Sequence, residues 1–280
     1  MLRPAARTAL ASAALGLAIA VAWGTSGSAA PAQHVADRVE RSLTGGGGAE
    51  KPEALLPNMT PLRATDIYVT GAGQSRQLRF ETSLANIGPG PMEVRPNRAL
   101  PCPGDQRGAS QVIYRDVDAN GSFRRDVDTQ VARRKAGCMV FHPTHNHWHF
   151  EASSFYSLRP VVDGPDHVAA YRKTSFCLRD SERVPERMGT FNYPLYYGAC
   201  SRDRPMGVSI GWTDVYQSFL DGQSLNLGDR SKVPNGRYCL GIRVDPKDGL
   251  KESDEKDNVS LRAIRLRGDS VTALPNKVCG

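Results

Sequence analysis

The chain has 280 residues, 40% of them hydrophobic, which is enough to bury a substantial core in one large domain or two small ones. Its formal net charge of +7 comes from dispersed lysines and arginines. No basic stripe is interleaved with aromatic residues, so nucleic acid is excluded as an expected partner.

The first thirty residues have the three parts of a secretory signal peptide. Residues 1–7 are short and basic, residues 8–23 are apolar and rich in alanine, and residues 28–30 are small residues suited to cleavage. We therefore predict a signal peptide over 1–30 and a secreted protein with no stable membrane insertion after cleavage. An uncleaved anchor is the alternative. Cleavage removes two arginines and lowers the net charge from +7 to +5.

A flexible linker is predicted over residues 31–52, because it contains four consecutive glycines at 45–48. Order is expected to begin near Leu55. We predict one domain over 53–280.

Short segments rich in β-branched and aromatic residues alternate with turn residues through this domain, and helical periodicity is weak after residue 60. The predicted strands are Asp66–Gly71, Leu78–Ile87, Met92–Val94, Val112–Tyr114, Trp148–Leu158, Ser175–Leu178, Gly236–Val244 and Val259–Leu266. Many short strands separated by turns predict an all-β chain, built as a β-sandwich with long loops.

The cysteine count is six, and an even number in an exported chain predicts three disulfides. No two cysteines have the CxxC spacing of a redox or zinc motif. The pairing stays open, since six cysteines allow 15 arrangements.

Four of the six histidines lie within the eight residues from His142 to His149. His145, His147 and His149 alternate with other residues, so on a β-strand their rings would project from one face. Neutral imidazole is the commonest protein metal ligand and suits copper, zinc, iron and nickel. In a flat strand the first and last of the three would lie roughly 13 Å apart, so we expect a twist or bulge if all three bind one ion. Two ligands with a spare histidine, or a polar surface strand, are the alternatives.

A second metal pattern begins at Asp116-Val117-Asp118-Ala119-Asn120-Gly121, which looks like the start of a calcium loop. Val127 stands where an EF-hand needs glutamate, although Asp126 and Asp128 flank it. A plain Asp/Gly turn is the preferred interpretation.

Two more stretches follow the histidines: Lys173-Thr174-Ser175-Phe176-Cys177-Leu178 and Gly211-Trp212-Thr213-Asp214-Val215-Tyr216. Each alone is an ordinary surface feature, but with the histidines they form an ordered set. From about Leu55 to Cys279 the chain resembles the lysyl oxidase family. HPTHNHWH matches the family's copper pattern His-x-x-His-x-His-x-His, KTSFCLRD is close to its KASFCLED, and GWTDVY matches its Gly-x-x-Asp-x-Tyr. PNGRY and LKESDEKDN match the strand and the PESDxxxN segment that follow.

This resemblance implies a secreted copper-dependent amine oxidase, which uses molecular oxygen to convert a primary amine to an aldehyde with release of hydrogen peroxide and ammonia. The amine would be a peptidyl-lysine or a small alkylamine. The resemblance implies copper bound by His145, His147 and His149, and a lysine tyrosylquinone made from Lys173 and Tyr216. It places His142 outside the ligand set.

General chemistry agrees with this assignment, because oxidation of an amine by oxygen needs an electron sink that ordinary side chains lack and a quinone supplies. A base must also remove the α-proton. Asp214 is the predicted base, since it lies two residues from Tyr216 and shares its strand face. The alternative is that Asp214 hydrogen-bonds backbone or orients a histidine.

The resemblance further implies a structural calcium site. Its oxygen-bearing residues would be Leu55, through its carbonyl, and Glu252, Asp254, Asp257 and Asn258. Ala54 stands where the family has an aspartate, and a solvated acidic turn is the alternative interpretation.

The chain departs from the animal enzymes around the copper pattern. Thr144 replaces a cysteine and Phe141 replaces a tryptophan, and the segment after Cys200 lacks the family's histidine. Cys200 would then pair differently or stay free.

Two other functions remain open from sequence. His145-x-His147-x-x-x-Glu151 satisfies half of a cupin motif, although His167 follows too soon to complete it. A non-catalytic secreted β-sandwich that binds metal is the second alternative.

Overall fold

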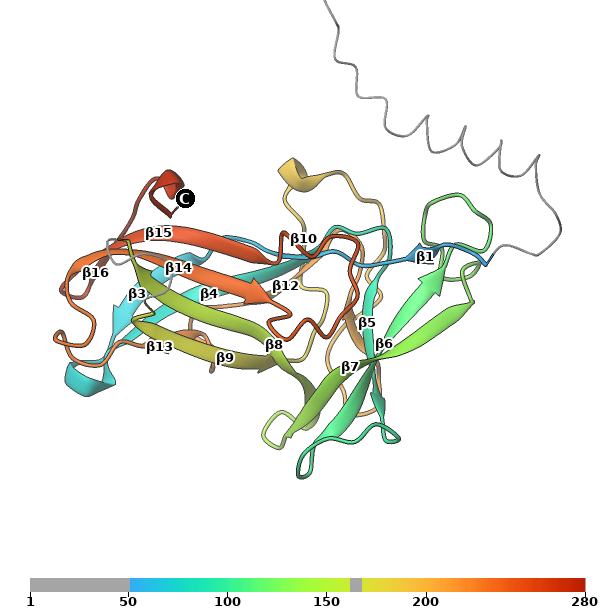
Figure 1. The fold of residues 1–280 in the computed structure, drawn as a ribbon, viewed down its shortest axis with the longest axis horizontal. Coiled ribbons are helices and arrows are strands. Elements are labelled where there is room, and N and C mark those ends of the chain that lie inside the picture. The colour runs from blue at the N-terminus through green and yellow to red at the C-terminus, as the bar shows by residue number, and fades with distance from the viewer. Residues whose placement is uncertain (1–50, 162–167, 280) are drawn as a thin grey trace, which may run out of the picture. The chain divides into compact units, whose positions relative to one another are not determined.

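A computed structural model of the protein describes residues 51–161 and 168–279 (Figure 1). These residues contain only β-strands and short 3-10 helices as regular elements, which confirms the predicted all-β class. The strands are β1 Ala54–Leu55, β2 Met59–Pro61, β3 Thr65–Thr70, β4 Gln77–Asn86, β5 Met92–Asn97, β6 Arg107–Arg115, β7 Val131–His142, β8 His147–Pro160, β9 Ala170–Phe176, β10 Glu182–Arg183, β11 Met206–Val208, β12 Trp212–Tyr216, β13 Ser224–Asn226, β14 Gly236–Val244, β15 Val259–Arg267 and β16 Ser270–Ala273. The 3-10 helices are η1 Gly73–Ser75, η2 Glu186–Met188 and η3 Asn276–Cys279.

The predicted signal peptide and residues 31–50 of the predicted linker lie outside the described residues. Within the described part, no helix is both long and apolar enough to cross a membrane.

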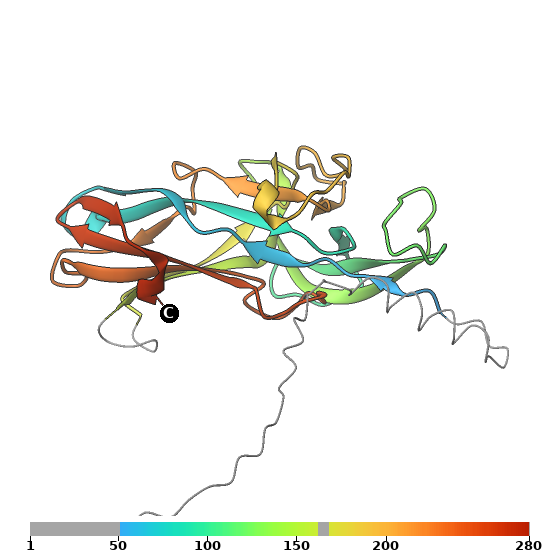
Figure 2. The ribbon, with the colours of Figure 1, turned by 90° about the horizontal axis from the view of Figure 1, so that it is seen from above.

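The strands form two antiparallel sheets. The larger has the order β11-β5-β6-β7-β8-β14-β15-β16, with β1 beside β6 and β9 beside β8. The smaller has the order β10-β12-β4-β13, with β2 and β3 also paired to β4. Figure 2 shows the blue-to-teal strands of the first half running along the orange-to-red strands of the second. Buried Phe80 of β4 meets buried Tyr156 of β8 edge to face, with ring centroids 4.9 Å apart, so the two sheets share one core.

Strand prediction succeeded where apolar and polar residues alternate. β14 has the predicted bounds, and β15 extends the prediction by one residue. β7 was missed, because Arg133, Arg134 and Lys135 interrupt the alternation and all three are exposed. The strand predicted over Ser175–Leu178 is wrong in its bounds, since β9 starts at Ala170 and ends at Phe176.

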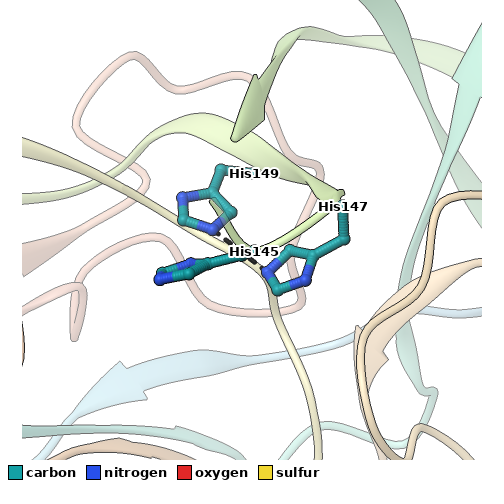
Figure 3. A group of neighbouring side chains, drawn as sticks. All are labelled: His145, His147 and His149. Carbon is teal, nitrogen blue, oxygen red and sulfur yellow. Dashed lines mark hydrogen bonds between the residues drawn. The ribbon is translucent and has the colours of Figure 1, made fainter. Parts of the chain in front are cut away.

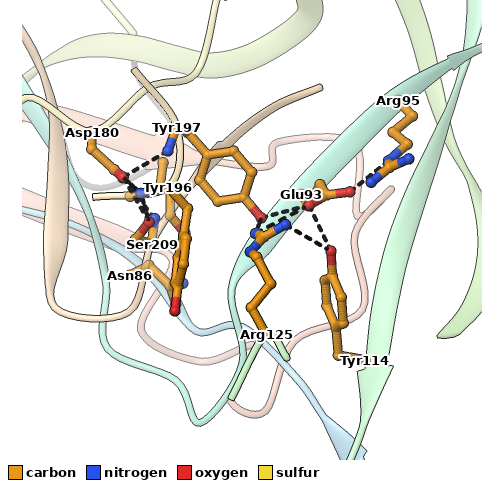
Figure 4. A network of polar contacts seen from close by, with 10 residues as sticks. Asn86, Glu93, Arg95, Tyr114, Arg125, Asp180, Tyr196, Tyr197 and Ser209 are labelled. Atoms are coloured by element: carbon orange, nitrogen blue, oxygen red, sulfur yellow. Dashed lines mark hydrogen bonds and ion pairs between the residues drawn. The ribbon is translucent and has the colours of Figure 1, made fainter. Parts of the chain in front are cut away.

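A buried carboxylate on β5 holds the long loop between β10 and β11. The Glu93 side chain accepts hydrogen bonds from the hydroxyls of Tyr197, at 2.7 Å, and Tyr114, at 2.9 Å (Figure 4). The guanidinium of Arg95 donates to its other oxygen at 2.6 Å. Burial alone would raise the pKa of Glu93, but these hydrogen bonds and the charge of Arg95 outweigh it and hold the pKa below its usual value.

Asp180 anchors the same loop a second time. Its Oδ2 accepts the backbone N–H groups of Tyr196 and Tyr197, both at 3.0 Å. Ser209 donates its backbone N–H to Oδ1 at 2.7 Å and its hydroxyl to Oδ2 at 2.6 Å. These contacts fix the loop that carries Cys200.

The substitution Glu93→Gln should lower the free energy of unfolding at pH 7 by about 3 kcal/mol, because it removes the charge of a buried carboxylate that accepts hydrogen bonds from Tyr197, Tyr114 and Arg95. A carboxylate with a lowered pKa stabilises the fold above its ordinary value of 4.5 and loses that contribution as the pH falls through its folded pKa. Urea unfolding should therefore show the difference between wild type and variant shrinking below pH 4.5.

Glu151→Gln is the matched control. Glu151 forms an ion pair with Lys247 whose side chains are 31% and 49% exposed, and its loss should change stability by less than about 1 kcal/mol. A wild-type advantage over Glu93→Gln that is constant from pH 7 to pH 3 would contradict the charge assignment.

Candidate metal and cofactor site

The histidines lie on a tight turn between two strands of the larger sheet. β7 ends at His142 and β8 begins at His147, and these two residues pair across the hairpin. The backbone N–H of His145 donates to the His142 carbonyl at 3.2 Å. Asn146 has a φ of 54°, a left-handed conformation that asparagine tolerates. The expectation that all three histidines lie on one strand is therefore wrong for His145, which lies on the turn.

This turn removes the spacing problem of a flat strand. Ring nitrogens of His145, His147 and His149 all lie within 4.8 Å of one another (Figure 3). The Nε2 atoms of His147 and His149 face each other at 3.2 Å. Because metal–nitrogen bonds are about 2.0 Å, two nitrogens at this separation fit a shared ion, and the residues present suit copper.

His147 and His149 are held in their neutral form. Burial, together with the charges of neighbouring histidines, lowers the pKa of His149 to about 4 and lowers that of His147. Neutral imidazole is the form that binds metal.

His142 lies beside this group. Its ring stacks on His145 at 4.0 Å and on His149 at 4.9 Å. It is not among the residues whose nitrogens converge within 4.8 Å, so its placement agrees with a position outside the ligand set. Glu151, from the cupin pattern, is also outside this group and pairs with Lys247 instead.

Three disulfides are present, which confirms the prediction from the even count: Cys102–Cys138, Cys177–Cys200 and Cys239–Cys279. Cys200 thus has a partner other than the cysteine that Thr144 replaces. The sulfur atoms of Cys177 and Cys200 lie within 4.8 Å of a ring nitrogen of His147. The disulfide therefore borders the histidine group.

Tyr216, on β12 of the smaller sheet, also lies beside the Cys177–Cys200 disulfide. Its ring stacks on Phe176 with centroids 3.8 Å apart. Its hydroxyl lies 2.7 Å from the Cys177 carbonyl and 2.8 Å from Oδ2 of Asp214. The predicted tyrosine is thus bonded to the residue whose sulfur borders His147.

Asp214 shares a strand face with Tyr216, as predicted. Burial raises the pKa of Asp214 well above its usual value. Burial, and then the Asp214 charge, raises the pKa of Tyr216. Both shifts favour the protonated form of the group.

Lys173 is not brought to Tyr216 in this state. Thr174 and Phe176 of β9 are buried, whereas Lys173 is exposed and, by strand alternation, projects from the opposite face. It pairs across the sheet with Phe155. The backbone of Ser175, two residues further along β9, hydrogen-bonds His149.

A group of oxygen atoms lies around Glu252, as the calcium expectation requires. Burial, followed by repulsion from Glu255, raises the pKa of Glu252 to about 8. Asn258 donates to it at 3.1 Å. The buried atoms Asn58 Oδ1, Asp257 Oδ1 and Asn258 Oδ1 have no hydrogen-bond partner. Unpartnered buried oxygens suit a hard cation, so these residues fit calcium.

On the N-terminal side of this group, the structure adds residues to the one expected from sequence, the Leu55 carbonyl. Leu55 packs in a small core cluster with Val112, Tyr114, Phe123 and Ile210. The residues that meet the acidic segment are Asn58, which donates to Asp257 at 3.1 Å, and Met59, whose backbone N–H donates to Glu252. Asp254 is exposed. Asn58 belongs to no motif, so no sequence signal marks it.

The carboxylates of the loop that begins at Asp116 accept hydrogen bonds from within the loop itself. Both oxygens of Asp116 accept backbone N–H groups, from Asn120 and Gly121, and both oxygens of Asp128 do the same within the loop. Asp118 pairs with Arg124 at 2.6 Å. One carboxylate oxygen from each of Asp116, Asp118 and Asp128 lies within 4.8 Å of the others, a spacing that could hold a cation, but the contacts within the loop favour the plain turn interpretation.

The chain matches a known protein family. The lysyl oxidase family model matches residues 124–275. Lysyl oxidase homolog 1 of Homo sapiens is 33% identical over 139 residues, which are 49% of this chain and 22% of that protein. Protein-lysine 6-oxidase of Gallus gallus is 30% identical over 131 residues, 46% and 28% of the two chains. Lysyl oxidase homolog 2 of Gallus gallus is 29% identical over 133 residues, 47% and 16%. The aligned part spans less than a third of each relative.

Chelation of calcium should destabilise the domain. At a calcium concentration 100 times its dissociation constant, binding contributes about 2.7 kcal/mol. Differential scanning calorimetry should show a lower melting temperature in a calcium chelator and recovery with added calcium. Asn258→Ala should abolish this recovery, whereas Asp118→Asn, in the self-satisfied loop, should retain it. Equal melting temperatures with and without calcium would contradict the site.

Proposed function

Because the chain belongs to the lysyl oxidase family, we propose that it is a secreted copper-dependent amine oxidase acting on peptidyl-lysine or a small alkylamine. The observation that carries the proposal is the hydrogen bond from Tyr216 to the Cys177 carbonyl. It holds a phenol against Cys177, the residue whose sulfur lies within 4.8 Å of a ring nitrogen of His147. The six paired cysteines agree with an oxidising, extracellular compartment.

The proposed reaction consumes one amine, one oxygen molecule and one water, and yields one aldehyde, one hydrogen peroxide and one ammonia. The amine carbon loses two electrons, and oxygen gains them. When bound, copper and the lysine tyrosylquinone of Lys173 and Tyr216 would supply the electron transfer that ordinary side chains cannot. His145, His147 and His149 would hold the metal.

The protein's own part is to hold and orient the phenol. Tyr216 has a single hydroxyl hydrogen but two oxygen neighbours. A carbonyl only accepts, so Tyr216 donates to Cys177, and Asp214 then donates its proton to Tyr216. We propose that Asp214 acts in this state as a neutral positioning residue. The base role predicted from sequence would require its proton to leave first.

Cross-link formation needs movement of Lys173. Its strand, β9, pairs only with β8 among the described strands, and the register between these strands shifts between Phe150 and Ser154. An edge strand opens at lower free energy than a central strand. We propose that the part of β9 around Lys173 detaches to bring the amine to the Tyr216 ring.

Calcium would have a structural role in this scheme. Its proposed residues include Leu55, Glu252, Asp254, Asp257 and Asn258, with Asn58 added by the structure. Asn58 and Met59 come from the start of the domain, while Glu252 lies between β14 and β15. A bound cation would fasten these distant segments together.

A non-catalytic metal-binding β-sandwich is the second candidate. The placement of Lys173 on the face opposite Phe176 favours it, because the Tyr216 ring stacks on Phe176 and the lysine side chain projects away from it.

Detection of the cross-link between Lys173 and Tyr216 distinguishes the two candidate functions. After copper loading and aeration, proteolysis of wild type should yield one covalently joined pair of peptides that contain Lys173 and Tyr216 and react with phenylhydrazine. A peroxide assay across lysine peptides and diamines should then show turnover. His147→Ala should abolish both the cross-link and turnover, because it removes a copper ligand. Lys247→Ala removes another exposed lysine of the same domain and should retain both.

Recovery of both residues only in linear, unmodified peptides would remove the enzymatic function and leave the metal-binding candidate. Normal cofactor yield in His147→Ala would contradict the copper assignment.

Substitutions at Asp214 distinguish a hydrogen-bond donor from a base. An asparagine amide can donate to Tyr216 as a protonated acid does, whereas alanine cannot. Asp214→Asn should therefore keep most of the cross-linked peptide and of kcat, and Asp214→Ala should lose both. If Asp214 were the general base, Asp214→Asn would instead lower kcat by about 10²–10⁴-fold. Wild type should also show the infrared band of a protonated carboxylic acid, and Asp214→Asn should lack it.

A further inference from the structure

Two different donor sets meet at His147. One is the histidine group with His145 and His149, and the other is the pair of sulfur atoms of Cys177 and Cys200. In each set, one ligand atom from every member lies within 4.8 Å of those from the other members. The sulfur atoms are joined in the disulfide, so in this state they are not free to bind metal.

Reduction would turn the disulfide into a chelating pair. The Cα atoms of Cys177 and Cys200 are 6.2 Å apart. Thiolate sulfurs bind zinc at about 2.3 Å in tetrahedral sites, and histidine completes such sites. Soft thiolates select Cu(I) and zinc, whereas three imidazoles suit Cu(II).

The surroundings hold this pair close to His147. The carbonyl of Cys177 accepts the Tyr216 hydroxyl, and its side chain is 5% exposed. Cys200 belongs to the loop that Asp180 and Glu93 anchor. These contacts do not involve the sulfur–sulfur bond, so they remain when that bond is cleaved. Among the described residues, Cys177 and Cys200 are the only cysteines grouped with a histidine.

We propose that the reduced chain has a second metal site, formed by Cys177, Cys200 and His147, which takes a soft or borderline cation such as zinc or Cu(I). His147 belongs to both sites, so the two exclude each other. While the disulfide is intact, His147 can bind metal only in the three-histidine site. The disulfide must therefore form before copper is loaded. This last consequence rests on the proposed function, whereas the thiolate site itself does not.

The redox step is a two-electron exchange. A small reductant of the phosphine or dithiol class supplies two electrons, two protons enter from solvent or the reductant, and the Cys177–Cys200 bond becomes two thiols. The reductant is oxidised to its phosphine oxide, with water as oxygen source, or to its own disulfide. Metal binding then releases the two thiol protons.

Cobalt(II) is the probe for this site, because thiolate ligands give cobalt an intense near-ultraviolet charge-transfer absorption that imidazole ligands do not. Metal-free mature chain is reduced with a phosphine, freed of reductant without oxygen, and titrated. The reduced wild type should gain this absorption with a stoichiometry of one cobalt per chain. The oxidised wild type should lack it.

Variants assign the absorption to this cysteine pair. The double variant Cys177→Ser/Cys200→Ser keeps the other two cysteine pairs and should lose the absorption after the same reduction. His147→Ala should weaken cobalt binding by the reduced chain by about tenfold or more. His145→Ala should leave the thiolate site unchanged and impair only copper binding by the oxidised chain.

A measurement on the wild type covers the case in which the double variant does not fold. Zinc should protect Cys177 and Cys200 of the reduced chain from alkylation, while the other four cysteines stay reactive. Equal alkylation of all six cysteines, or charge-transfer absorption that survives in the double variant, would overturn the proposal. Neither readout depends on amine oxidation, so an inactive but zinc-protected protein would contradict only the proposed enzyme.

Discussion

The hydrogen bond between Tyr216 and the Cys177 carbonyl joins the two sheets at the point where the chemistry is proposed. Tyr216 ends β12 of the smaller sheet, and Cys177 directly follows β9 of the larger one. Stacking of Tyr216 on Phe176 adds a second contact at the same junction. These contacts align the phenol of one layer of the sandwich with the histidines of the other.

Two buried carboxylates maintain that junction from a distance. Glu93 and Asp180 each accept several hydrogen bonds, and between them they fix the segment from Tyr196 to Ser209. Cys200 lies inside that segment and is bonded to Cys177. These buried carboxylates thus hold the residues beside the histidine group through the loop and the disulfide.

The sequence predicted those features that depend on local pattern. Alternation in Gly236–Val244 predicted a strand with its observed bounds, and the histidine spacing predicted a metal group that does converge. The route to convergence was not predictable, because it depends on the left-handed Asn146 and a turn that moves His145 off the strand. Contacts between distant segments carry no local signal either.

Asn58 illustrates this second limit. It meets Asp257 across 199 positions of sequence, and nothing around it marks it as an oxygen donor. The predicted Leu55 lies only three residues earlier, so the motif indicated the region of the chain that meets the acidic segment. The pairing of Cys177 with Cys200 was open for the same reason.

The edge position of β9, which pairs only with β8 among the described strands, has a consequence for solubility. An unpaired strand edge invites other chains to add to it, and lysine side chains are a common protection against such addition. Lys173 and Arg172 are the charged residues of β9. If the amine of Lys173 is consumed in a covalent link, that edge loses one of its two cations. The unprocessed form would then resist strand-mediated self-association better than the mature form, unless the link itself covers the edge.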